Sequence, residues 1–356
     1  MQNPPESIPA GDSSHDRWAR LRILDANANR AHEGLRVVEE HARFVLEDPF
    51  LARQFKQLRH DLAAALADLP LAERLAARDT PGDIGTTITT PSEWVRESVA
   101  QVAAANLARV EQSLRCLEEY AKGFLPPLAA AAESLRYRTY PLAQAVARLP
   151  HALARLGHAR LYVLVDAQRG EADFCEFIEG LVQAGVDLIQ LRDKRRDDRS
   201  LLEYARLLRR LTRGTPTLFV MNDRPDLAML ADADGVHVGQ EELKPADVRR
   251  LVGASMLVGV STHSLVQARQ AVLDGADYLG CGPTFPSTTK HFDAFMGLEF
   301  LREAAAEIRL PAFAIGGITL GRLPDVRAAG FSRVAVSGAI AAPAAARAFV
   351  QALAQP

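Results

Sequence analysis

Cysteine is scarce in this sequence: its 356 residues include three, Cys116, Cys175 and Cys281, and none belongs to a Cys-x-x-Cys or Cys/His pattern. We therefore expect neither a disulfide framework nor a structural zinc site. Long apolar runs are also lacking, since none approaches the roughly 18 residues of a membrane-spanning helix. The first 17 residues lack the basic-then-apolar order of a signal peptide. We expect a cytoplasmic protein with no membrane partner.

The chain also lacks an excess of charge of either sign. Lys and Arg total 42, Asp and Glu total 44, and the formal net charge is -2. A chain this close to neutral is not expected to bind nucleic acid, although local clusters of cations can still bind phosphates. We therefore expect small-molecule ligands. The sequence leaves the oligomeric state open, a homo-oligomer included.

Two regions of the chain have different residue patterns, and 356 residues are enough for two domains. Residues 17–140 predict an all-helical domain, because Ala-, Leu-, Arg- and Glu-rich stretches follow one another with one Gly/Pro/Thr-rich break, "RDTPGDIGTTITTPSEW". Residues 141–158 contain two prolines and a helical pattern, which predict a connector helix. Residues 159–356 form the predicted second domain.

The second domain alternates short β-branched runs with amphipathic stretches, which is typical of strand–helix units in an α/β fold. Eight strands are expected, at residues 160–166, 186–194, 217–223, 234–240, 256–261, 277–283, 311–317 and 333–339. Eight such units in this length favour a C-terminal (β/α)8 TIM barrel preceded by the all-α domain. A doubly wound open sheet is the weaker alternative, since no GxGxxG follows the first strand.

Charged residues follow several predicted strands, at the barrel end where such folds carry their chemistry. The cations Arg192, Lys194 and Lys290 suit an anion with more than one charge, whereas Asp223 and Glu242 would repel it. A Mg2+ ion resolves this conflict, because it binds carboxylates together with substrate phosphates. The site therefore predicts a pyrophosphate-like ligand with a metal.

A second phosphate site is expected after the last two strands, where glycines and the Ser337 hydroxyl precede helix N-termini. No Ser/His/Asp arrangement or cysteine nucleophile is evident. His237, inside "GVHVG", is interpreted as an interior barrel residue and not as a base. Two phosphorylated ligands and no nucleophile point to group transfer.

Seven motifs occur on these strands in order: "QLRDK", "FVMNDRPDLA", "ADGVHVGQEE", "GVSTHS", "GPTFPSTTK", "AIGGI" and "VAVSGAI". Together they resemble the thiamine-phosphate synthase family over residues 159–353. The resemblance implies a transferase that joins hydroxymethylpyrimidine pyrophosphate to hydroxyethylthiazole phosphate and releases pyrophosphate. It also implies that pyrophosphate leaves first and that the thiazole nitrogen captures the resulting pyrimidine-methyl cation, so that no general base is needed.

The resemblance also implies site residues. Those for the pyrimidine pyrophosphate are Gln190, Leu191, Arg192, Asp193, Lys194, Asn222, Ser261 and Lys290. Those for the thiazole phosphate are Ser287, Thr288, Thr289, Gly317, Val336 and Ser337. Asp223 and Glu242 correspond to the Mg2+ carboxylates, and Arg192, Ser261 and Lys290 are the expected catalytic residues. Glu242 departs from the family's usual Asp, and Ser287 from its usual Thr.

Two other functions stay open for the barrel. A thiazole tautomerase shares the fold but shifts a proton, and the intact "QLRDK", "ND" and "TTK" motifs favour the synthase over it. A non-catalytic sensor of phosphorylated ligands is the other alternative.

The helical domain contains an internal repeat: "LRVVEEHAR" at Leu35–Arg43 recurs as "LRCLEEYAK" at Leu114–Lys122. In each copy the paired glutamates are interpreted as the solvated face of an amphipathic helix. Upstream of each phrase, three polar residues at helical spacing form a line along one face of the helix. They are Asn27, Arg30 and Glu33 in the first copy, and Asn106, Arg109 and Gln112 in the second. These two polar lines are the stronger candidates for function, and we expect them to face each other across a cleft.

Residues 17–140 also resemble a helical domain that is often fused ahead of thiamine-phosphate synthase and is associated with hydroxymethylpyrimidine phosphate kinase activity. The motifs are "DANANRAHEGLRVVEEHARF", "DTPGDIGTTI" and "AANLARVEQSLRCLEEYAK". This resemblance implies a bifunctional chain. No Walker A motif supports ATP binding, and a structural or dimerising helical module is the alternative.

Overall fold

The structure, a computed structural model, describes residues 14–88, 95–286 and 297–355. The chain separates into two compact units: the first comprises Met1–Glu47 and Leu51–Ala143, and the second comprises Asp48–Phe50 and Gln144–Pro356. Among the described residues, no helix is both long and apolar enough to cross a membrane.

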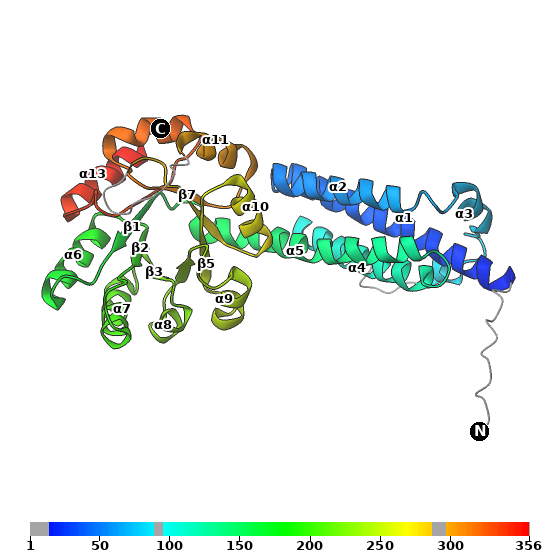
Figure 1. The fold of residues 1–356 in the computed structure, drawn as a ribbon, viewed down its shortest axis with the longest axis horizontal. Helices are drawn as coiled ribbons and strands as arrows, with labels where there is room; N and C mark the ends of the chain where they lie inside the picture. The colour runs from blue at the N-terminus through cyan, green and yellow to red at the C-terminus, as the bar shows by residue number, and fades with distance from the viewer. Residues whose placement is uncertain (1–13, 89–94, 287–296, 356) are drawn as a thin grey trace, which may run out of the picture. The chain divides into compact units, whose positions relative to one another are not determined.

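The second unit is a closed barrel of eight strands (Figure 1). Each strand pairs in parallel with the next, and β8 pairs with β1. The strands are β1 (Leu161–Val165), β2 (Leu188–Leu191), β3 (Leu218–Asn222), β4 (Gly235–Val238), β5 (Leu257–Thr262), β6 (Tyr278–Cys281), β7 (Ala312–Ile315) and β8 (Val334–Val336). Every predicted strand is present, so the (β/α)8 prediction is confirmed and the open sheet is excluded.

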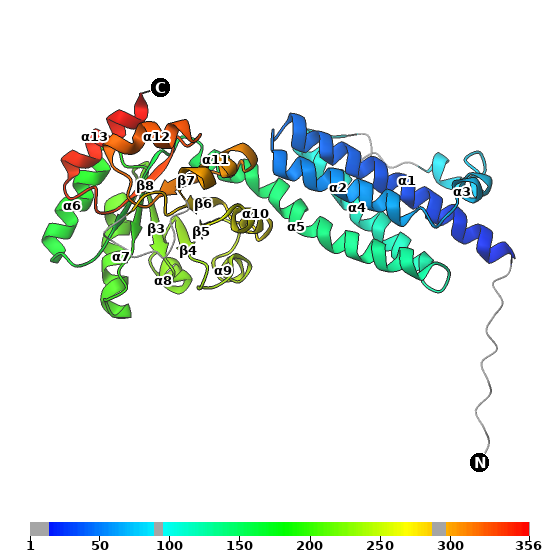
Figure 2. The same cartoon turned by 45° about the horizontal axis from the view of Figure 1, so that its top comes forward.

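Helices lie around the barrel and connect successive strands (Figure 2). They are α6 (Glu171–Gln183), α7 (Asp198–Thr212), α8 (Pro225–Leu230), α9 (Pro245–Val252), α10 (Leu265–Leu273), α11 (Gly297–Glu307), η3 (Leu320–Arg322), α12 (Leu323–Ala328) and α13 (Pro343–Ala354). Gly275 follows α10 with a φ of 81°, a conformation that favours glycine at the end of a helix.

Three large aromatic side chains fill the barrel interior. Tyr162, Tyr278 and Phe313 are at most 2% exposed and contact one another edge to face. Gly259 on β5 makes room for them, because a Cβ there would collide with the ring of Tyr278 and with His237. The interior is therefore a packed core, and ligands have access only at the strand ends.

The first unit is built from helices. These are α1 (Ser14–Phe44), α2 (Pro49–Ala65), α3 (Leu71–Ala77), η1 (Ile84–Thr87), α4 (Val99–Ala121) and the first part of α5 (Pro126–Leu156). The segment predicted as a connector is helical, but α5 runs through it without a break as far as Leu156, so it is not a separate short helix.

The two copies of the repeat lie on α1 and α4, which pack along each other. Gly34 allows their close approach, since a Cβ there would lie 2.7 Å from the Cγ2 atom of Val110. The equivalent residue of the second copy, Ser113, is also small and buried. Leu35, Val38 and Ala42 form a buried apolar stripe on α1, whereas Val45 is exposed.

The interpretation of the paired glutamates as solvated is wrong for one member of each pair. Glu39 and Glu118 are only 3% exposed, and each accepts from an arginine of the following helix. Arg59 Nε lies 3.0 Å from Glu39 Oε2, and Arg136 Nη2 lies 2.8 Å from Glu118 Oε2. Local periodicity cannot predict this, because both arginines are distant in sequence.

The predicted cleft between the two polar lines is not formed by the expected side chains. The amides of Asn27 and Asn106 donate to carbonyls of their own helices, at Ile23 and Val102. The remaining members of the lines are exposed: Arg30, Glu33, Arg109 and Gln112.

Candidate active site

A chain of hydrogen bonds crosses the barrel interior and links two of the predicted site residues. Gln190 Nε2 on β2 donates to the Tyr162 hydroxyl at 2.5 Å, and that hydroxyl lies 3.0 Å from the hydroxyl of Tyr278. The Tyr278 hydroxyl lies 3.2 Å from His237 Nδ1, and His237 Nε2 lies 2.9 Å from Ser261 Oγ. Gln190 and Ser261 are therefore held by one network.

The network carries no charge at neutral pH. Burial lowers the pKa of His237 to about 4, and the Glu242 carboxylate opposes this only in part. Burial also raises the pKa values of the Tyr162 and Tyr278 hydroxyls. His237 lies in the barrel interior, as predicted. Its hydrogen bond orients Ser261, and its lowered pKa makes it a weak acceptor for a substrate proton.

Two carboxylates converge on one cation at the ends of β3 and β4. Lys194 Nζ lies 3.0 Å from Asp223 Oδ2 and 3.3 Å from Glu242 Oε1. The hydrogen bond with Asp223 is the main reason that the pKa of Lys194 is raised. Asp223 has a left-handed φ of 59°, an unusual conformation for a non-glycine residue, and its N–H donates to the His237 carbonyl.

The same carboxylates fit a divalent cation. Both carboxylates reach one cation, the Lys194 ammonium group, and carboxylate oxygens are ligands that Mg2+ prefers. Asp223 and Glu242 would therefore be the residues that hold the ion, with the Glu242 carboxylate lying against Gly239. Within the described residues, no group of three or more His, Cys, Asp or Glu side chains could hold a metal. The remaining ligands would have to be substrate phosphate and water.

The loop after β2 gives its residues different roles. Arg192 is half-buried. Leu191 is fully buried in the core, so only its backbone can reach a ligand. The Asp193 carboxylate accepts from the backbone N–H groups of Ala167 and Arg195. Burial raises the pKa of Asp193, but these hydrogen bonds outweigh burial and hold it below its usual range. In the structure Asp193 thus fixes the shape of the loop that presents Arg192 and Lys194.

The ends of β7 and β8 provide backbone groups and one exposed hydroxyl. Gly316 and Gly317 have left-handed φ values of 98° and 62°, which favour glycine. At Gly317 a Cβ would lie 2.6 Å from the Pro286 carbonyl oxygen. Ser337 follows β8 and is exposed, whereas Val336 is buried.

One arginine at this end of the barrel was missed from the sequence. Arg322 Nη1 donates to the Gly317 carbonyl at 2.5 Å, and its guanidinium lies 4.6 Å from the ring centroid of Phe285. The signal was a basic residue shortly after the "AIGGI" motif.

The predicted residues Ser287, Thr288, Thr289 and Lys290 lie outside the described residues. Among the others, the structure brings Lys194, Asp223 and Glu242 together. Asn222 ends β3 next to Asp223 and is half-buried.

Comparisons with known proteins match the barrel to one family. A family model described as thiamine monophosphate synthase matches residues 161–340. The curated thiamine-phosphate synthase of Rhodopirellula baltica is 49% identical over 331 residues, covering 90% of this chain and 88% of that protein. The one of Gloeobacter violaceus is 46% identical over 323 residues, covering 90% of this chain and 92% of that protein.

Among solved structures, thiamine phosphate pyrophosphorylase from Pyrococcus furiosus aligns with a TM-score of 0.49 and 32% identity, covering 55% of this chain and 95% of that chain. The helical unit matches a second family model, described as the ThiD2 family, over residues 22–145. The two family models thus cover one unit of the chain each.

Proposed function

The chain belongs to the thiamine monophosphate synthase family and is a transferase, and from this premise we propose how its barrel works. It joins hydroxymethylpyrimidine pyrophosphate to hydroxyethylthiazole phosphate, giving thiamine phosphate and pyrophosphate. The observation that carries the proposal is the convergence of Asp223, Glu242 and Lys194 at the strand ends. A pyrophosphate leaving group needs positive charge, which a lysine and a metal ion held by the two carboxylates would supply.

We assign the leaving group to the loop after β2 and the end of β3. Arg192 and Lys194 compensate the negative charge that develops on the departing pyrophosphate, and Asn222 donates an amide hydrogen bond nearby. Lys290 is expected to add a third cation. Gln190 and Ser261 orient the pyrimidine, since the internal network fixes both side chains in place.

Asp223 and Glu242 would hold Mg2+. When bound, this ion supplies positive charge to the pyrophosphate oxygens. In the structure Lys194 forms ion pairs with both carboxylates. A Mg2+ ion held by these carboxylates would leave the Lys194 ammonium group to pair with phosphate oxygens. The longer side chain of Glu242 still reaches the cation, since its Oε1 atom lies 3.3 Å from Lys194 Nζ.

The acceptor is assigned to the opposite part of the barrel mouth. Backbone N–H groups near Gly317 and Ser337, with the Ser337 hydroxyl, bind the thiazole phosphate, and residues 287–289 are expected to join them. The thiazole nitrogen then attacks the pyrimidine-methyl carbon with its own lone pair. No proton has to be removed, so the mechanism needs no base, and His237, whose pKa is lowered to about 4, would be a weak one. Catalysis rests on placing the two substrates in line and stabilising the leaving group.

Titration with Mg2+ tests the metal assignment. We expect Asp223→Asn to raise the Mg2+ concentration for half-maximal thiamine phosphate formation at least about tenfold, because one of two protein ligands is weakened. Glu242→Gln should act in the same direction. Glu241→Gln is the matched control, since this neighbouring residue is exposed and has no role in the proposal. The assignment fails if Asp223→Asn and Glu241→Gln give the same Mg2+ curve as the unmodified chain.

The helical unit has a second candidate function, favoured by its match to the ThiD2 family model over residues 22–145. We propose that it phosphorylates hydroxymethylpyrimidine phosphate and so supplies the substrate of the barrel. ATP-dependent formation of the pyrimidine pyrophosphate by the full chain, with thiazole phosphate omitted, tests this proposal. The kinase proposal fails if the folded chain makes thiamine phosphate from added hydroxymethylpyrimidine pyrophosphate but forms no pyrimidine pyrophosphate from the monophosphate and ATP. The helical unit would then have a structural role.

A further inference from the structure

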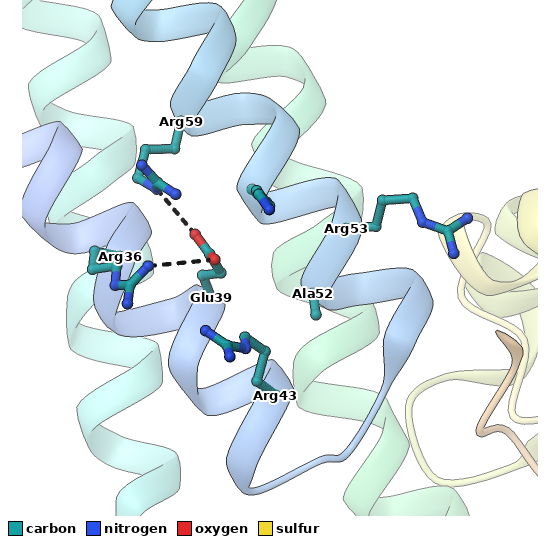
Figure 3. A pocket seen from close by; sticks show the side chains of 7 residues that line it. Arg36, Glu39, Arg43, Ala52, Arg53 and Arg59 are labelled. Atoms are coloured by element: carbon teal, nitrogen blue, oxygen red, sulfur yellow. Dashed lines mark hydrogen bonds and ion pairs between the residues drawn. The ribbon is translucent and has the colours of Figure 1, made fainter.

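A basic cavity lies between α1 and α2 of the helical unit (Figure 3). It has a volume of about 460 Å³ and is lined by Arg36, Glu39, Arg43, Ala52, Arg53, Lys56 and Arg59. Five of these side chains are cationic and one is a carboxylate. This volume lies within the roughly 300–1,000 Å³ that is usual for small-molecule pockets.

The single carboxylate neutralises only part of this charge. Glu39 is bound by Arg59 Nε at 3.0 Å and lies 3.6 Å from Arg36 Nη1 (Figure 3). Within the described part of the chain, no carboxylate forms an ion pair with Arg43 or Lys56. Two cationic side chains at this cavity therefore have no protein anion to compensate them.

The second copy of the repeat provides an internal comparison. There the equivalents of Arg36, Glu39 and Arg43 are Arg115, Glu118 and Lys122. Lys122 Nζ lies 2.9 Å from Glu119 and 3.3 Å from Glu118.

The arginine that reaches the buried glutamate is also enclosed in the second copy. Arg136 donates to the Tyr140 hydroxyl at 2.8 Å and lies 4.7 Å from the ring centroid of Tyr137. In the second copy the cation equivalent to Arg43 is thus paired with carboxylates. In the first copy Arg43, which lies 4.7 Å from the ring centroid of Phe44, and Lys56 have no carboxylate partner among the described residues.

We propose that the α1–α2 cavity binds the phosphate group of a small organic phosphate ester. A phosphate monoester carries about -1.5 to -2 charge near neutral pH, which matches the two uncompensated cations. The cavity is larger than a phosphate group needs, so the organic part of the ester also has room. The ester bound there is the phosphorylated substrate of the helical unit; this identification, unlike the binding itself, rests on the kinase activity proposed above.

Arginine and lysine have separate roles in this arrangement. The Arg43 guanidinium extends from α1 into the space beside Glu39 (Figure 3) and can form two parallel hydrogen bonds to a phosphate. Lys56, on α2, supplies a point charge from the other wall. The Arg59–Glu39 ion pair holds one wall of the cavity in place.

Calorimetric titration of the full chain with inorganic phosphate and with hydroxymethylpyrimidine phosphate, in EDTA and without ATP, tests the proposal. Lys56→Gln and Arg43→Gln should each weaken binding about tenfold or more, because each removes a charge-assisted hydrogen bond. Lys56→Arg keeps the charge and should retain binding. Hydrogen–deuterium exchange should show protection of residues 36–60 by the bound ester.

Lys122→Gln is the matched control, because it removes the equivalent of Arg43 in the compensated copy and should leave the affinity unchanged. The proposal is overturned if the two Gln variants bind like the unmodified chain, if Lys122→Gln weakens binding equally, or if protection is confined to barrel peptides. Binding that the Gln variants weaken, without ATP-dependent turnover, would support phosphate binding in the cavity and contradict only the kinase activity. ATP-dependent turnover, with binding unchanged in the Gln variants, would support the kinase activity and contradict phosphate binding in the cavity.

Discussion

Acidification should destabilise the barrel through His237. An unfolded histidine takes up a proton as the pH falls below 6.5, but the buried ring resists protonation until about pH 4. Because the folded pKa is the lower one, the stabilisation is fully present above pH 6.5 and is lost as the pH falls toward 4. Between about pH 7 and pH 5 the loss is about 2 kcal/mol, and it reaches about 3 kcal/mol below pH 4.

The test compares the unmodified chain with His237→Gln, which keeps a polar amide but cannot titrate. Urea unfolding at several pH values, read by pulsed hydrogen exchange of residues 257–281, reports on the barrel and not on the helical unit. The variant should lose stability at neutral pH, since the network is interrupted, but its free energy of unfolding should fall about 2 kcal/mol less between about pH 7 and pH 5.

His158→Gln is the control because His158 is exposed, and this variant should retain the pH dependence of the unmodified chain. If His237→Gln and the unmodified chain lose the same free energy on acidification, His237 is not a buried neutral ring and the description of the network is wrong.

Three further predictions concern other parts of the chain. Glu118→Gln should lower the free energy of unfolding by roughly 3 kcal/mol, because the buried ion pair with Arg136 loses its negative charge. Glu119→Gln should leave stability nearly unchanged. Equal effects of the two variants in urea unfolding, followed by tryptophan fluorescence, would contradict the burial of Glu118. Gly34→Val should destabilise the helical unit by about 1–3 kcal/mol, since its Cβ would meet Val110, and an unchanged thermal midpoint would refute the close approach. Gly317→Ala should raise KM for the thiazole phosphate about tenfold, because Gly317 has a left-handed φ and the Pro286 carbonyl leaves no space for a Cβ. A larger effect on KM for the pyrimidine substrate would contradict the assignment of the thiazole phosphate to this part of the barrel.

The sequence predicted the barrel well because its strands are short, largely apolar runs set off by turn residues, and many of them are β-branched. Val163, Ile189 and Val258 belong to such runs, and all are buried in strands. The convergence of Asp223 and Glu242 was also predictable, since the carboxyl ends of parallel barrel strands meet at one face.

Side-chain direction was less predictable than strand position. Asp193 belongs to a charged motif, but its carboxylate turns back to the backbone N–H groups of Ala167 and Arg195. Glu39 and Glu118 have the spacing of exposed helix ion pairs, and their burial depends on Arg59 and Arg136, which local periodicity does not reveal. Such contacts arise between elements that are distant in sequence, and they require the tertiary fold.

One measurement tests the central claim most directly: the purified chain is mixed with hydroxymethylpyrimidine pyrophosphate, hydroxyethylthiazole phosphate and Mg2+, and thiamine phosphate and pyrophosphate are quantified together. The account predicts equimolar formation of both products when both substrates are present, no thiamine phosphate when either substrate is omitted, and a strong loss of rate in Asp223→Asn. Isomerisation of the thiazole phosphate without coupling, or binding of both substrates without any product, would contradict it and favour the tautomerase or the sensor.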